Sequence, residues 1–170
     1  MPDFDGPSAQ LTAPAPALHT PAWTLRPALA DDVEAAAELR AVVMRADLER
    51  LGRYDPDRVR QRLRNSFSHE HSSIITLDGA FAGCVTLRPA ESGGLLLEHF
   101  YLDPRHQGRG LGGRVLRTLL ARADAVGEPV RLQVLRGSAA RRLYERHGFA
   151  LESEDPVDVF MLRPPARAAG

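Results

Sequence analysis

Apolar and polar positions follow two rhythms along this chain, one typical of strands and one typical of helices. Apolar runs at 74–77 and 81–87 flank Asp78-Gly79, a pair that favours the tight turn of a β-hairpin. Across 114–123, apolar residues recur at helical spacing, which predicts an amphipathic helix with one buried stripe. The whole pattern predicts strands at 23–28, 74–77, 81–87, 95–102, 130–135, 150–153 and 157–162, and helices at 31–40, 114–123 and 138–147.

This succession of strands and helices predicts a single domain of the α/β (α+β) class with a mixed sheet. At 170 residues and 44% hydrophobic content, the chain has the size of one domain with one sizeable core. Residues 1–22 are rich in proline and alanine and are expected to form a disordered leader. Residues 23–163 are then the folded domain and residues 164–170 a flexible tail.

Charge, cysteine count and hydropathy indicate which kinds of partner the protein binds and in which cellular compartment it lies. Lys and Arg together number 22, as do Asp and Glu, so the overall charge indicates neither nucleic acid nor an anionic membrane as a partner. No apolar run approaches the roughly 20 residues of a membrane span, and Cys84 is the only cysteine. We therefore expect a cytoplasmic protein without intrachain disulfides.

The most informative stretch is a glycine-rich turn between the apolar strand at 95–102 and the helix at 114–123. It reads Gln107-Gly108-Arg109-Gly110-Leu111-Gly112-Gly113. Glycines reach backbone conformations closed to other residues, and the unpaired N–H groups at a helix N-terminus attract an anion. The turn therefore predicts a site for a phosphate or pyrophosphate group.

Two other nucleotide-binding classes share this logic and fit less well. The glycine spacing satisfies the dinucleotide fingerprint G-x-G-x-x-G, but that motif places its first glycine at the end of the strand, and here residues 103–107 intervene. The fingerprint also requires an acidic residue about 20 positions later, where this chain has Arg136 after its next strand. A P-loop is excluded, because no Gly-Lys-Ser/Thr sequence is present.

Two motifs resemble those of the GNAT acyltransferases, a family of enzymes that use acetyl-CoA. Residues 107–112 match that family's Gln/Arg-x-x-Gly-x-Gly/Ala motif, and the strand before them ends in Leu102-Asp103-Pro104, as is usual there. Residues 138–149 resemble the family's last helix, Asn-x-Ala-x-x-Leu-Tyr-Glu-x-x-Gly-Phe, with Ser138 in place of the asparagine. The resemblance covers residues 23–163 and implies a mixed, mostly antiparallel, twisted sheet of six to seven strands flanked by about four helices.

The resemblance also implies that acetyl-CoA is the co-substrate, with no metal expected. The glycine turn would hold the pyrophosphate, Ser138 would begin the last helix as its N-cap and face the pantetheine arm, and N–H groups of residues 100–102 would bind the thioester carbonyl. Arg105, Arg109 and Arg114 would meet the nucleotide phosphates or, equally, form an exposed rim. The full cofactor-binding set is Phe100, Tyr101, Leu102, Gln107, Gly108, Arg109, Gly110, Leu111, Gly112, Gly113, Ser138 and Tyr144.

Two residues are candidates for catalytic proton transfer. Tyr144 is expected to protonate the departing thiolate, because the resemblance places its phenol near the CoA sulfur; helical spacing alone favours a core tyrosine. Glu98 alternates with Phe100 and Leu102 on one face of an apolar strand, and it is either the base for the amine or a solvated residue at the edge of that face. His99 is expected on the opposite face as a structural histidine.

The acceptor is expected to bind between the first strand and the hairpin, at residues 39–67. Residues 38–64 carry eight arginines and five acidic residues, which predicts either a positive wall for an acceptor with a carboxylate or phosphate, or the solvated faces of two helices. His69-Glu70-His71 lacks a third ligand at a recognisable spacing and is not expected to bind metal. Cys84 lies in an apolar strand and is expected to pack rather than react.

Two functions follow from these features. The first is an N-acetyltransferase that moves an acetyl group from acetyl-CoA to a primary amine of a small molecule or peptide by direct attack. The second is a catalytically weak acyl-CoA-binding module that senses or regulates, which would not need a phenol beside the sulfur. Dimers are frequent in the family that the chain resembles, so we expect self-association as a homodimer.

Overall fold

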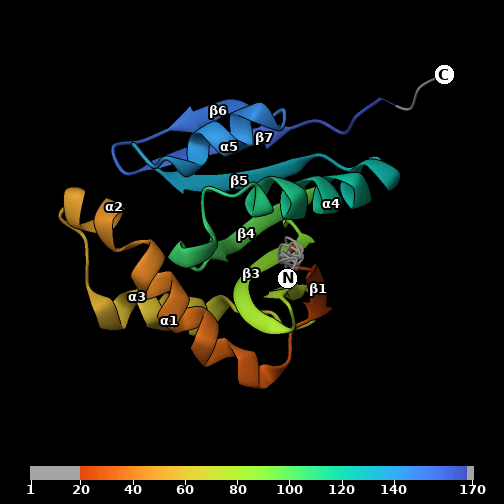
Figure 1. Ribbon diagram of the computed structural model, residues 1–170. Coiled ribbons are helices and arrows are strands. Elements are labelled where there is room, and N and C mark those ends of the chain that lie inside the picture. The colour runs from red at the N-terminus through yellow and green to blue at the C-terminus, as the bar shows by residue number, and fades with distance from the viewer. Residues whose placement is uncertain (1–19, 168–170) are drawn as a thin grey trace, which may run out of the picture.

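The computed structural model describes residues 20–167, which form one seven-stranded sheet and five α-helices (Figure 1). The strands are β1 (Trp23–Pro27), β2 (Ser72–Leu77), β3 (Ala80–Pro89), β4 (Leu95–Leu102), β5 (Val130–Leu135), β6 (Ala150–Glu154) and β7 (Asp158–Arg163). The helices are α1 (Val33–Val43), α2 (Arg45–Arg50), α3 (Pro56–Ser66), α4 (Leu111–Ala125) and α5 (Ala140–Arg146), with short 3₁₀ turns η1 (Ala30–Asp32) and η2 (Pro104–His106).

The strands lie in the order β1-β2-β3-β4-β5-β7-β6. Five of the neighbouring pairs are antiparallel, and β4 with β5 is the parallel pair. The predicted class, a mixed and mostly antiparallel sheet flanked by helices, is therefore confirmed. The parallel pair lies in the interior of the sheet, where it joins the strands β1 to β4 to the strands β5, β7 and β6.

Helices cover both faces of the sheet. Ile75 and Val85 pack against the buried stripe of α4, which includes Leu116, and α5 joins the same cluster through Tyr144. Ile74 points the other way and packs against buried residues of α1 and α3. Since neighbouring strand residues point to opposite faces, α4 with α5 and α1 with α3 form two separate layers, as Figure 1 shows.

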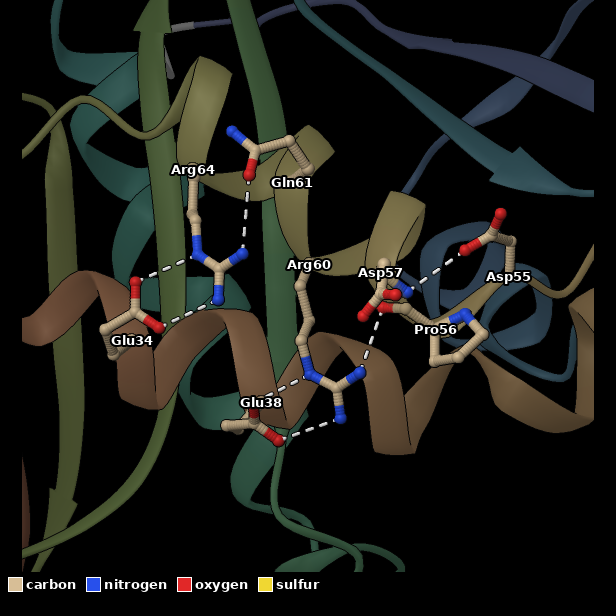
Figure 2. Close-up of polar contacts among 8 residues, drawn as sticks. All are labelled: Glu34, Glu38, Asp55, Pro56, Asp57, Arg60, Gln61 and Arg64. Carbon is tan, nitrogen blue, oxygen red and sulfur yellow. Dashed lines mark hydrogen bonds and ion pairs between the residues drawn. The ribbon is translucent and has the colours of Figure 1, made fainter.

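Local sequence explains how α3 begins and how it is held. Asp55 accepts hydrogen bonds from the first backbone N–H groups of the helix, and Pro56 occupies its first position, where no amide hydrogen is needed. Two arginine–glutamate pairs then fasten α3 to α1, with a guanidinium fork on each carboxylate (Figure 2). These pairs are Arg60 with Glu38 and Arg64 with Glu34.

Several element boundaries differ slightly from the sequence prediction. The helix expected at 31–40 starts as η1 and continues as α1 to Val43. The sequence predicts Ser138 as the N-cap of the last helix, but α5 begins later, at Ala140, whose N–H donates to the Ser138 hydroxyl at 3.3 Å. Most of the expected leader, residues 1–19, and the last three residues of the expected tail lie outside the described part of the chain. Between residues 20 and 167, no helix is long and apolar enough to span a membrane.

Candidate active site

β4 and β5 touch over a very short length and then separate. Their register contains only the pairs Leu95 with Val130 and Leu96 with Arg131. Beyond these pairs, the second half of β4 has no backbone partner on its β5 side in this register. The chain leaves β4 through η2 and enters the glycine turn, so the turn and the start of α4 follow directly from the separated end of β4.

The glycine turn has a backbone that requires glycine at two positions. Gly108 and Gly110 have φ angles of +72° and +81°, and a Cβ at either would meet nothing within 4 Å, so conformation rather than crowding explains these residues. Gly110 is the N-cap of α4, and no side chain caps the helix there. A Cβ at Gly112 would lie 3.5 Å from the side chains of Leu102 and Leu143, so the start of α4 approaches β4 and α5 closely. Residues 107–110 of the turn are exposed, and the uncapped helix N-terminus that follows them suits an anion.

The polar side chains around this turn divide into bound and unbound groups. Gln107 donates from Nε2 to the Leu102 carbonyl at 2.9 Å, which fastens the turn to the end of β4. Arg105 binds both oxygens of Asp103 and lowers the pKa of that carboxyl to about 2. Its guanidinium group is therefore already paired with a carboxylate of the protein. Arg109 and Arg114 are exposed and form no ion pair with the described residues.

A β-bulge interrupts β4 in the middle of the candidate site. Cys84 of β3 pairs with Tyr101, whereas Thr86 pairs with Glu98, so two residues of β4 oppose one residue of β3. His99 is one of the two and has a φ angle of +50°, a left-handed conformation that is uncommon outside glycine. The bulge therefore shifts the alternation of side chains by one residue from this point on.

This shift corrects the sequence prediction for β4. Glu98, His99 and Tyr101 all face the cleft that α1 and α3 border, while Phe100 and Leu102 pack in the core cluster of α4. The alternation in the sequence predicts Glu98 on the face of Phe100 and Leu102, with His99 on the opposite face. His99 does lie opposite to Phe100 and Leu102, but the placement of Glu98 is wrong, because it shares the cleft side with His99. A strict period of two holds only for a regular strand, and the extra residue of the bulge breaks it.

The cleft has a volume of about 1180 Å³ and lies between α1–α3 on one side and β4 with β5 on the other. The turn at 155–158 between β6 and β7 closes one end. The segment 39–67, expected to contact the acceptor, supplies much of the lining. The residues that line the cleft are Arg40, Met44, Leu48, Leu51, Gly52, Arg53, Arg58, Val59, Arg62, Ser66, Leu96, Leu97, Glu98, His99, Tyr101, Gln133, Val134, Leu135, Asp155, Pro156, Val157 and Asp158.

Glu98 and His99 lie side by side but have different partners. Glu98 accepts from Arg88 Nε through Oε1 at 2.6 Å, and Oε2 makes no hydrogen bond within residues 20–167. His99 Nε2 lies 2.9 Å from the Ser66 hydroxyl, which itself donates to the Arg62 carbonyl at 2.8 Å. Because that hydroxyl has one proton, His99 Nε2 carries the hydrogen of the His99–Ser66 bond. Burial lowers the pKa of His99, which favours its neutral form.

Two tyrosines, Tyr144 on α5 and Tyr101 near the separated end of β4, have raised pKa values. Tyr144 on α5 is 7% exposed and packs edge-on against Phe149, with ring centres 5.7 Å apart. Burial raises the pKa of Tyr144, and the nearby Tyr101 phenol raises it further. Tyr101 donates to the Met44 sulfur at 3.6 Å, and burial raises its pKa to about 12. Both phenols thus stay protonated at neutral pH, as a proton donor must.

The acetyltransferase (GNAT) family model matches residues 36–149. This range contains the glycine turn, the motif at 138–149 and the strands β4 and β5. The chain belongs to the GNAT family. Its fold is similar to that of PaiA N-acetyltransferase from Thermoplasma acidophilum, solved in complex with coenzyme A, with a TM-score of 0.69, 19% identity and coverage of 84% and 99% of the two chains. Ribosomal-protein-S18-alanine N-acetyltransferase from Escherichia coli gives a TM-score of 0.65 at 19% identity, covering 87% and 97%.

A local sequence similarity adds a third relative of this GNAT chain. It is 33% identical over 78 residues to a tRNA-acetylating toxin of Mycobacterium tuberculosis. The match covers 44% of this chain and 47% of the toxin, so it spans about half of each.

Sequence reasoning missed three features of this GNAT site. Ser66 as the partner of His99, and the side chain of Tyr101 as part of the cleft, were not anticipated. The third feature is a row on α3, where Arg58, Arg62 and Ser66 face the cleft together. Their spacing of four residues was a readable signal, because such residues share one face of a helix.

Proposed function

We propose that this chain transfers an acetyl group from acetyl-CoA to a primary amine of a small molecule or peptide. The observation that carries the proposal is the separation of β4 from β5 directly before an uncapped, glycine-rich helix N-terminus. In that arrangement an anion can bind at the turn while a thioester lies along unpaired β4 amides. The cleft between β4 and the helices α1 and α3 offers the amine a separate route to the thioester.

The geometry of the turn supports a set of coenzyme contacts. The N–H groups of residues 108–113 bind the pyrophosphate, with Gln107 keeping the turn against β4. Ser138 contacts the pantetheine arm, although it is shorter than the asparagine usual in the family. The N–H groups of residues 100–102 donate to the thioester oxygen as negative charge develops on it.

The reaction needs two proton transfers around one acyl transfer. The amine nitrogen attacks the thioester carbon, a C–N bond forms, the C–S bond breaks, and the electron pair of that bond leaves with the thiolate of CoA. Tyr144 donates its phenolic proton to this thiolate, while Glu98 takes the surplus proton of the amine through its free Oε2. Proton exchange with water then restores both residues.

One comparison favours a second class of acceptor. Because the mycobacterial relative is named a tRNA-acetylating toxin, an amine carried on tRNA belongs in the set of acceptors to be tested. The competing function is a binding module that takes up acyl-CoA without turning it over. A buried, protonated Tyr144 supports the enzyme over the binding module.

The test follows thiol release from acetyl-CoA in the presence of small amines, peptides and aminoacylated tRNA. Cys84 does not disturb this readout, because it is 1% exposed and burial raises its pKa to about 12. Tyr144→Phe is expected to lower kcat about 10- to 100-fold with coenzyme affinity nearly unchanged. Tyr54→Phe, which removes a phenol from the loop before α3, is the matched control and is expected to change neither.

Two outcomes would contradict the proposal. Thermal stabilisation by acetyl-CoA without thiol release on any acceptor would favour the binding module. No uptake of coenzyme A by folded protein, measured by calorimetry, would remove the glycine turn as its binding site.

A further inference from the structure

The arginines of the segment between α1 and α3 fall into two groups. Those with a carboxylate partner lie outside the cleft lining: Arg45, Arg50, Arg60 and Arg64. Those that line the cleft form no ion pair with any carboxylate of the described chain: Arg40, Arg53, Arg58 and Arg62. In this segment, the arginines outside the cleft are therefore balanced by carboxylates, whereas those that border the cleft have no carboxylate partner.

Helix α3 shows this separation within its own length. Arg60 and Arg64 turn toward α1, where Glu38 and Glu34 hold them (Figure 2). Arg58 and Arg62 lie on the cleft side, one turn apart, with no carboxylate between them to offset their repulsion. A helix that keeps two like charges adjacent on its cleft side, while pairing the other two, is suited to bind an anion there.

The row leads toward the proposed reaction centre. Ser66, one turn after Arg62, binds His99 at 2.9 Å, and His99 is adjacent to Glu98. Arg40 on α1 lies close enough to influence the charge of His99 from the other side. Along α3, Arg62 and Arg58 thus precede the residue that binds His99 by one and two turns, about 6 and 12 Å along the helix axis.

The negative charges of the cleft do not cancel this row. Glu98 is already bound by Arg88 at 2.6 Å. Asp155 accepts two backbone hydrogen bonds in the turn before β7, which lower the pKa of this carboxyl, and the charge of Arg53 lowers it further. Asp158 begins β7. The acids lie on β4 and at the far turn, whereas the α3 side is positive.

We propose that the acetyl acceptor carries phosphate, which binds Arg58 and Arg62 while its amine reaches Glu98; this rests on the proposed acetyl transfer. A guanidinium without a protein partner forms paired hydrogen bonds to phosphate oxygens, and two of them match a multiply charged group better than a single carboxylate. The volume of about 1180 Å³ exceeds the roughly 300–1,000 Å³ of ordinary small-ligand pockets. A phosphorylated small amine and an amine on a nucleic-acid strand share this chemistry.

The test compares matched primary amines at saturating acetyl-CoA with the full-length protein. The set contains 2-aminoethyl phosphate, 3-aminopropanoate, ethanolamine and a 5′-aminohexyl oligonucleotide. One or both phosphate-bearing amines are expected to show kcat/KM values at least tenfold above those of ethanolamine and 3-aminopropanoate. This preference should shrink as salt concentration rises. A preference for 2-aminoethyl phosphate would indicate a phosphorylated small amine as the acceptor, and a preference for the oligonucleotide would indicate an amine on a nucleic-acid strand.

Arg58→Gln and Arg62→Gln are each expected to lower kcat/KM for the preferred phosphate acceptor about tenfold or more, with ethanolamine changed less than about twofold. Arg64→Gln removes the same charge from the same helix but from the side that faces α1, so the preference should survive. Polarisation of a labelled oligonucleotide, with CoA saturating, reports binding without turnover.

Three results would overturn the inference and leave acetyl transfer intact: equal use of phosphate and neutral amines, a preference for the carboxylate, or equal losses on every amine in the arginine variants. Should no amine be acetylated, the proposed function fails. In that case, absence of binding of both phosphate compounds in the presence of CoA would also reject the arginine row as a phosphate site.

Discussion

The proposed base can be separated from its neighbour by two substitutions on β4. Glu98→Gln keeps the size of the side chain and removes its ability to take a proton. His99→Asn removes the imidazole, and asparagine tolerates the φ angle of +50° better than other side chains do. If Glu98 accepts the proton of the amine, only the first change should abolish the acidic limb of the pH–rate profile.

The structure allows the expected magnitudes to be worked out. Loss of a general base lowers the rate roughly 10²- to 10⁴-fold, or about 3–5.5 kcal/mol of activation free energy. The ion pair lost with Glu98 is partly exposed, at 31% for Arg88 and 21% for Glu98, and pairs of this kind contribute about 1 kcal/mol to stability. Loss of the hydrogen bond from His99 to Ser66 costs a similar amount. Neither change should unfold a domain of ordinary stability, about 5–15 kcal/mol.

The assay is kcat/KM for one good amine across about pH 5 to 9, with thermal unfolding of each variant measured in parallel. Glu98→Gln is expected to lose activity roughly 10²- to 10⁴-fold with a flat acidic limb, and His99→Asn to lose much less with the limb retained. An unchanged profile in Glu98→Gln would remove Glu98 from the mechanism. A profile flattened by His99→Asn alone would assign the role to His99.

Two further predictions concern the frame around the site. A Cβ at Gly83 would collide with the backbone oxygen of Tyr101, so Gly83→Ala should lower the free energy of unfolding, measured in urea, by about 1–3 kcal/mol. Gly112→Ala is the control, because a Cβ there has ordinary contacts. Equal urea midpoints for the two variants would contradict the reasoning. Arg163 lowers the pKa of Asp124 from 3.8, so this carboxylate stabilises the fold above about pH 4 and the contribution is lost as pH falls below that value. Asp124→Asn should lower the free energy of unfolding by roughly 1–3 kcal/mol at neutral pH and remove the loss of stability that protonation of Asp124 causes in acid. Unfolding measured at neutral and at acid pH tests both effects.

The sequence predicts most of the fold because local signals are strong there. The hairpin turn at Asp78-Gly79 needs positive φ angles at both residues, which measure +48° and +81°, and this pair is a common solution. The glycine turn and the stripe of α4 are likewise contained in short stretches of sequence. Each of these elements could be predicted because its cause lies within a few residues of it.

The parts that could not be predicted depend on distant residues. His99 has no sequence signal for a left-handed conformation, and its bulge arises from the pairing of β4 with β3. The sequence also could not show which arginines lack a carboxylate partner, because Arg60 and Arg64 find theirs 22 and 30 positions away. A count of charged residues could not distinguish a positive wall of the cleft from a solvated helix face. The structure distinguishes them, because it shows which arginines are paired with carboxylates.

The two-residue contact between β4 and β5 has a mechanical consequence. With so few backbone bonds at that seam, the alignment of the two halves of the sheet depends on apolar side chains of α4, which share one core cluster with Leu97 on one half and Val130 on the other. Trimming a buried methyl group of α4 can therefore tilt donor and acceptor relative to each other, an effect separate from the loss of stability of about 1 kcal/mol that such a change causes. Distant core substitutions in this helix should be judged by turnover as well as by thermal denaturation.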